Sequence, residues 1–131
     1  DTQDFLTEMT NEIMAMGPYF RAVVDSLDFF MQREDPSRVV AMLRMMQAHT
    51  QLHRGILFIT VSNDTITPAI KQEMAAIADM VCDFKVRTVG SDFETSMIVS
   101  KFRNAPENLS IMVYRVTPEE GITPETVERI A

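Results

Sequence analysis

Asp25 and Ser26 are the first residues whose type and position point to chemistry, because they end an apolar, β-branched segment at residues 20–27. A carboxylate at the carboxyl end of a strand lies where open parallel sheets bind their ligands. In proteins that hydrolyse nucleotides, an aspartate in this place helps to hold Mg²⁺. The same pattern is typical of a strand followed by a turn residue, so the segment alone leaves both interpretations open.

Lys101 and Arg103 form the second candidate site, at the end of a predicted strand. In an extended chain the two side chains point to the same face, two residues apart. Two fixed cations at a sheet end suit a polyphosphate or a carboxylate, which arginine can bind bidentately. A solvated strand end is the alternative. Lys85, Arg87 and Arg115 lie on neighbouring predicted strands and extend a basic strip.

Three further residue patterns occur, and none of them is predicted to form a functional site. Asp28 and Asp25 would suit an acid and base pair, but they fall on different backbone elements, and we interpret Asp28 as a turn residue. His49 and His53 share a predicted helix face without an evident third metal ligand, so we interpret that face as solvated. Cys82 is the one cysteine, which excludes an internal disulfide and a Cys-based zinc cluster.

Helices are predicted wherever apolar residues recur at helical spacing or a capping residue precedes proline. The first covers residues 2–16, and Asp35-Pro36 and Thr67-Pro68 begin two more. Thr123-Pro124 predicts a short last helix by the same rule. These helices must position the residues named above.

Strands are predicted by two different patterns. Continuous apolar runs predict strands at 20–27 and 56–61, buried on both faces, whereas strand-like segments at 81–89, 94–102 and 109–116 follow one another without a helix between them. The alternation of helix and strand predicts an α/β fold with a parallel sheet. The successive later strands predict an antiparallel extension on one edge of that sheet.

Composition limits the classes of function. The chain has 131 residues, 46% of them hydrophobic, which suits one domain with a core. Its net charge of −7 makes general binding to nucleic acid or to an anionic membrane unfavourable. Apolar runs fall short of the roughly 18 residues that span a bilayer. Together with the lone cysteine, this predicts a cytoplasmic protein without membrane contact.

The order of the motifs resembles the second half of a RecA-superfamily ATPase domain of the KaiC-like type. The segments that carry the resemblance are VVDSL (23–27), LFITVS (57–62), IADMVCDFKV (77–86), IVSKFRN (98–104) and VTPEEGI (116–122). The resemblance implies one partial RecA-like three-layer domain over residues 1–131. Residues 1–80 would form its α/β Walker B part, and residues 81–131 its antiparallel extension and terminal helix.

The resemblance also implies roles for single residues around a nucleotide. Asp25 matches the Walker B aspartate, which binds Mg²⁺ through water, and Ser26 follows it. Ser62 or Asn63 falls where the family has a polar residue that senses the γ-phosphate.

Two cations match an element that the family uses between subunits. Lys101 and Arg103 match a Lys-x-Arg element that reaches the γ-phosphate of nucleotide held by the adjacent subunit, as an arginine finger does. Asn104 stands where the family usually has glycine, which is a departure from its pattern.

A second departure concerns the phosphate-binding loop. None of the four glycines belongs to a GxxxxGK(S/T) motif, so we expect that loop, its strand and the catalytic glutamate to precede residue 1. Without the loop's amides and lysine the phosphates lose most of their contacts. The chain alone is therefore expected neither to bind MgATP tightly nor to hydrolyse it, and MgATP is an expected cofactor only together with such an upstream half.

A missing strand would leave the strand at 56–61 with an apolar edge, which invites pairing with another chain. We therefore expect a homo-oligomer. The main hypothesis is part of a KaiC-like ATP-binding or signalling protein. The alternative is a degenerate, non-catalytic module that oligomerises or binds a protein partner. A DNA-binding RecA relative is the third hypothesis, against which the net charge and the absence of tryptophan argue.

Overall fold

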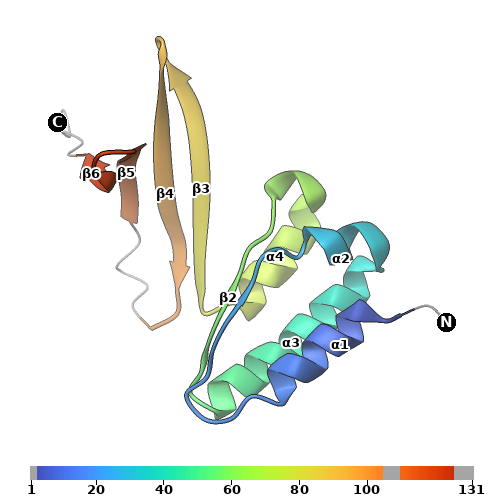
Figure 1. Cartoon of the computed structure of the whole chain (residues 1–131). Helices are drawn as coiled ribbons and strands as arrows, with labels where there is room; N and C mark the ends of the chain where they lie inside the picture. The colour runs from blue at the N-terminus through green and yellow to red at the C-terminus, as the bar shows by residue number, and fades with distance from the viewer. Residues whose placement is uncertain (1–2, 105–109, 126–131) are drawn as a thin grey trace. The chain divides into compact units, whose positions relative to one another are not determined.

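The computed structural model describes residues 3–104 and 110–125, and the chain divides into two compact units, Asp1–Ala78 and Asp79–Ala131. The fold is mixed α/β, with a parallel pair of strands in the first unit and a four-stranded antiparallel sheet in the second (Figure 1). The first unit contains α1 (Phe5–Met14), β1 (Arg21–Val24), α2 (Asp28–Arg33), α3 (Pro36–Leu52), β2 (Ile56–Ile59), the 3₁₀ turn η1 (Asn63–Thr65) and α4 (Pro68–Ile77). The second contains β3 (Met80–Val89), β4 (Asp92–Phe102), β5 (Ser110–Thr117) and β6 (Gly121–Glu125).

Helices α3 and α4 begin at Pro36 and Pro68, as the sequence predicts, whereas α1 begins at Phe5 and not at residue 2. Asp4 accepts a hydrogen bond from Thr7 N and caps α1. Asp35 accepts from Ser37 N at the start of α3, and Thr67 accepts from Ile70 N at the start of α4. Each cap satisfies an amide that has no partner within its own helix. In the described residues no helix is long and apolar enough to cross a membrane.

The parallel sheet pairs β1 with β2, so that Val23 lies beside Phe58. Alternate residues of both strands pack on the buried cluster between the helices. Val23 and Phe58 point the other way and are exposed. The prediction that both strands are buried on both faces is therefore wrong, because the helices of this unit cover one face of the pair (Figure 1).

The core of the first unit lies where α1, α2 and α3 meet the covered face of the sheet. Its buried members are Leu6, Ile13, Phe20, Leu27, Phe30, Val39, Leu43 and Met46. His49 joins them, because its Nε2 lies 2.9 Å from Met16 O and its ring packs beside Phe20 and His53. The predicted solvated histidine face is therefore wrong for His49, whose polar atom finds a backbone partner in the interior.

The antiparallel strands form a sheet of their own in the order β3-β4-β5-β6, rather than the predicted extension of the parallel sheet. A tight turn at Gly90, whose φ is +63°, joins β3 directly to β4. This local hairpin satisfies the backbone groups on one side of β3 without a parallel neighbour.

One face of this sheet is apolar and the other carries ion pairs. Directly paired residues of antiparallel strands project to the same side. Arg87 pairs with Glu94 and Arg115 with Glu125 on the charged face. The exposed apolar side chains of the other face are Phe84, Val86, Phe93, Met112, Val116 and Ile122.

The predicted last helix at Thr123-Pro124 is wrong for the residues that the structure describes there. They belong to β6, which pairs with β5 after a turn that ends at Gly121, whose φ is +70°. A proline is tolerated in β6 because the strand lies at the sheet edge, where an absent N–H costs no ladder bond. The remainder of the predicted helix, residues 126–131, lies outside the described residues.

Candidate functional site

The predicted carboxylate site lies where β1 and β2 end side by side. Two backbone hydrogen bonds join the loops that follow: Thr60 N donates to Val24 O at 3.1 Å, and Leu27 N donates to Thr60 O at 2.9 Å. Parallel strands carry their carboxyl ends to the same edge of a sheet. The structure therefore brings Asp25 and the segment from Thr60 to Thr65 together, across about 35 residues of sequence.

Asp25 is exposed at this edge, and the Thr60 hydroxyl holds its carboxylate. Its Oδ1 accepts a hydrogen bond from Thr60 Oγ1 at 2.6 Å. Ser26, joined to Asp25 by a cis peptide bond, accepts from Asp28 N through Oγ at 3.2 Å. The Ser26 hydroxyl is therefore engaged by the first amide of α2, while the Asp25 carboxylate stays accessible to a ligand.

Asp28 is the residue of this site whose role the sequence did not reveal. It is the first residue of α2 rather than the predicted turn residue. Its carboxylate accepts from Ser62 N at 2.9 Å, from Ser62 Oγ at 2.7 Å and from Thr65 Oγ1 at 2.8 Å. These bonds lower the pKa of Asp28 from 3.8 to about 2, the backbone amide of Ser62 contributing most.

The site therefore has an accessible carboxylate and a structural one. Asp28 fastens the loop after β2 to the start of α2, which fixes Ser62 through both its amide and its hydroxyl. Asn63, the other predicted phosphate-sensing residue, is the exposed first residue of η1. The only sequence signal for the contact between Asp28 and Ser62 was a hydroxyl residue in the loop after each strand. Such residues are too common in loops to identify the contact.

Replacement of Asp28 by asparagine should make the stability of the first unit less dependent on pH. A carboxyl group whose folded pKa is depressed stabilises the fold fully above its unfolded pKa of 3.8 and loses that contribution as the pH falls through about 2. The melting temperature of D28N should lie below that of the wild type at pH 6, and the two should converge between pH 4 and 2. Thermal unfolding followed by circular dichroism measures this, and a difference that stays constant with pH would contradict the assigned contacts.

The donor chemistry at this edge fits a magnesium ion only in part. Mg²⁺ is commonly bound through one or two carboxylates, with water and substrate phosphates in its remaining positions. Asp25 offers one such carboxylate, whereas the Asp28 oxygens are engaged by Ser62 and Thr65. Within the described ranges no group of three or more His, Cys, Asp or Glu residues could hold a metal ion. Asp25 therefore fits a magnesium that phosphates help to hold, not one held by protein alone.

Lys101 and Arg103 belong to the second unit. Lys101 lies near the end of β4, opposite Val81. Arg103 follows that strand and is fastened to Asp79: its amide donates to Asp79 O at 2.8 Å, and its Nη1 lies 2.7 Å from Asp79 Oδ1. Arg103 would have to leave this exposed ion pair to reach a ligand, which costs little because such pairs are weak.

The predicted basic strip is less positive than its sequence suggests. Arg87 and Arg115 form cross-strand ion pairs with Glu94 and Glu125. Arg103 is paired with Asp79. Arg87, Arg103 and Arg115 thus each have a carboxylate beside them, which lowers the potential that would attract a phosphate backbone.

Comparison with known proteins supports the fold and adds one family. A family model described as a family of unknown function (DUF7125) matches residues 1–114. No curated protein matches the chain. Among solved structures, the flagellar accessory protein FlaH from Methanocaldococcus jannaschii is similar, with a TM-score of 0.69 and 18% identity over 94% of this chain and 54% of that one.

A KaiC-like protein from the hyperthermophilic archaeon Pyrococcus horikoshii OT3 is also similar, with a TM-score of 0.63 and 15% identity over 93% of this chain and 53% of that one. The chain thus spans about half the length of each solved structure that it resembles. At these identities the similarity concerns the fold alone. The predicted resemblance to KaiC-like proteins is confirmed at that level.

Proposed function

The chain belongs to DUF7125, a family of unknown function, and we propose that it supplies the Walker B half of a RecA-like, KaiC-type nucleotide-binding domain. The observation that carries the proposal is the Asp25 carboxylate, exposed at the carboxyl end of a parallel pair of strands and oriented by Thr60. Asp28 holds the neighbouring Ser62 beside it.

The open edge of β2 supports the same proposal. Among the described residues, β2 pairs with β1 and with no other strand. A further strand that carries a phosphate-binding loop would fit beside β2 and bring phosphates to the edge where Asp25 and Ser62 lie. The 131 residues contain no such loop, so the nucleotide site is incomplete within this chain.

Each candidate residue then has a defined task. Asp25 would hold magnesium through a water molecule, and Ser62 or Asn63 would contact the terminal phosphate. A bound magnesium would neutralise phosphate charge during transfer. Lys101 and Arg103 would act on nucleotide held by an adjacent subunit, after Arg103 leaves Asp79.

The test is made on the longest native protein that contains this chain. The coding sequence before Asp1 should encode a strand, a GxxxxGK(S/T) loop and a helix. That protein should hydrolyse ATP with magnesium, and Asp25→Asn should slow turnover at least about 100-fold, the scale of losing one preorganised electrostatic contact. Residues 1–131 alone should give no binding heat with MgATP in calorimetry.

Glu73→Gln is the matched control, because Glu73 is exposed on α4 and its loss changes the net charge by the same amount. It should leave turnover unchanged. The proposal fails if the upstream sequence lacks the loop, if D25N turns over like the wild type, or if the 131 residues hydrolyse ATP by themselves.

A second candidate is a non-catalytic module that self-associates. The exposed apolar face of the β3–β6 sheet favours it, because contiguous apolar surface of this kind marks interaction sites. Sedimentation of the same samples separates the two candidates. Assembly that is unaffected by MgATP and by D25N supports the module, whereas assembly that requires MgATP supports the nucleotide-binding domain.

A further inference from the structure

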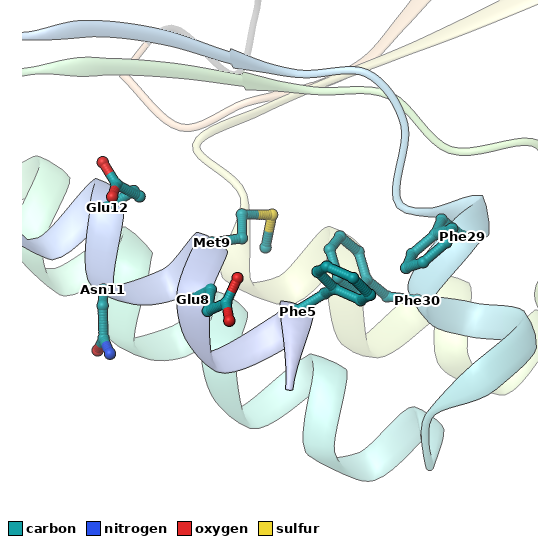
Figure 2. Close-up of a pocket in the computed structure, with 7 residues that line it drawn as sticks. All are labelled: Phe5, Glu8, Met9, Asn11, Glu12, Phe29 and Phe30. Carbon is teal, nitrogen blue, oxygen red and sulfur yellow. The ribbon is translucent and has the colours of Figure 1, made fainter. Parts of the chain in front are cut away.

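An open pocket of about 670 Å³ lies between α1 and α2 (Figure 2). This volume is within the usual range for a binding pocket. All of its lining residues belong to the first unit: Phe5, Glu8, Met9, Asn11, Glu12, Phe29 and Phe30, which we call the α1–α2 pocket. None of them takes part in the carboxylate site at the ends of β1 and β2.

Aromatic rings form the apolar part of the α1–α2 pocket. The rings of Phe5 and Phe29 pack edge to face with centroids 5.9 Å apart, and those of Phe29 and Phe30 do so at 5.2 Å. Phe30 is buried, but Phe5 and Phe29 remain 46% and 40% exposed. Met9, half-buried beside them, has a flexible side chain that adapts to different partners. Large exposed aromatic residues in a hollow are typical anchors for a binding partner.

Carboxylates form the other side of the α1–α2 pocket. Glu8 and Glu12 are exposed and lie one turn apart along α1, in a row next to that of Phe5 and Met9. In the part of the chain that the structure describes, neither glutamate forms an ion pair. The adjacent acidic residues Asp4 and Glu34 differ, because each of them forms an ion pair with Arg38. Glu8 accepts a hydrogen bond from the neutral Gln3 side chain at 3.3 Å, so among the described residues no basic side chain offsets the charge of either glutamate.

Arg33 places a positive charge on the side of the α1–α2 pocket away from Glu8 and Glu12. Its guanidinium lies 4.0 Å from the centroid of the Phe29 ring, on the side of the neighbouring hollow that Arg38 also lines. A positively charged partner is thus favoured along α1 and disfavoured beside Arg33. This polarity orients a partner along the row of Glu8 and Glu12.

We propose that the α1–α2 pocket binds a basic amphipathic helix of a partner protein. Lysine or arginine residues four positions apart on such a helix match the spacing of Glu8 and Glu12, about 6 Å along a helix axis. An apolar side chain from the adjacent face of the partner helix would enter between Phe5, Met9 and Phe29. Apolar anchors combined with a charged row are the recognition mode of helix-in-groove complexes, and the net charge of −7 attracts such a partner at long range.

The test uses a fluorescein-labelled peptide, LKKLLKLLKKLLKL, titrated with the longest native protein that contains this chain and followed by fluorescence anisotropy. The double variant Glu8→Gln with Glu12→Gln should bind at least about fivefold more weakly, as expected for two exposed charge pairs. Phe29→Ser should weaken binding further, since it removes an anchor. Circular dichroism confirms that each variant is folded.

The double variant Asp64→Asn with Glu73→Gln is the matched control, because both residues are exposed in the same unit and the net charge changes equally. It should bind the peptide with an affinity within about twofold of the wild type. That margin covers the weak long-range effect of removing two distant charges. Equal weakening in both double variants would overturn the proposal, as would equal binding of the peptide with glutamate in place of lysine. Preferential binding to anionic phosphatidylserine vesicles, or self-association blocked by E8Q/E12Q, would also overturn it.

Discussion

Replacement of Leu27 by alanine should lower the free energy of unfolding of the first unit by about 2–5 kcal/mol, the usual cost of truncating a buried leucine. Leu27 is 0% exposed and lies in the core cluster with Phe30 and Met46. Its amide also donates to Thr60 O, which ties the loop after β1 to the loop after β2. The cavity would therefore open next to the hydrogen bond that joins these two loops.

Urea unfolding monitored by circular dichroism measures the effect of L27A. Leu52→Ala is the matched control, since the same atoms are removed from a side chain that is 77% exposed at the end of α3. It should change the free energy of unfolding by no more than about 0.5 kcal/mol. Similar losses in the two variants would show that Leu27 is not a core residue. A wild-type-like pH dependence in L27A would show that the Asp28 contacts survive the cavity.

Replacement of Gly55 by alanine should cost about 1–3 kcal/mol, because an added methyl group overpacks the site. A Cβ at this position would lie 2.4 Å from Phe20 Cε1 and 2.6 Å from Phe20 Cδ1. The Phe20 ring is buried and cannot turn away freely. The backbone is also held on both sides, since Gly55 N donates to Thr50 O and Ile56 N donates to Phe20 O, each at 2.9 Å.

Gly17→Ala provides the control for G55A. A Cβ at Gly17 meets nothing within 4 Å, so the substitution should be neutral or should stabilise the chain by up to about 1 kcal/mol through the unfolded state. Denaturant unfolding of the two variants side by side is the measurement. A Gly55→Ala variant as stable as the Gly17→Ala variant would contradict the close approach of Phe20 to this backbone.

The sequence alone determined the features that depend on neighbouring residues. Helices begin at Pro36 and Pro68 because a capping side chain and a proline at the first turn act within three residues. The apolar segments around Val23 and Phe58 form strands, and Asp25 follows the first of them as predicted. The order of these segments was also enough for the resemblance to KaiC-like proteins, which the similarity to a solved KaiC-like structure confirms for the fold although the identity is only 15%.

Only the tertiary structure decided which residues that are distant in the sequence contact one another. Asp28 was predicted to be a turn residue. In the fold its carboxylate accepts hydrogen bonds from Ser62 and Thr65, which lie more than 30 residues later in the sequence. His49 was expected in solvent, but Met16 O offers its ring nitrogen a partner inside. Thr123-Pro124 has the local pattern of a helix start, yet hydrogen bonds to β5 make it a strand. Local preferences are worth a few tenths of a kcal/mol up to about 1 kcal/mol per residue, so non-local pairing and burial override them wherever the two conflict.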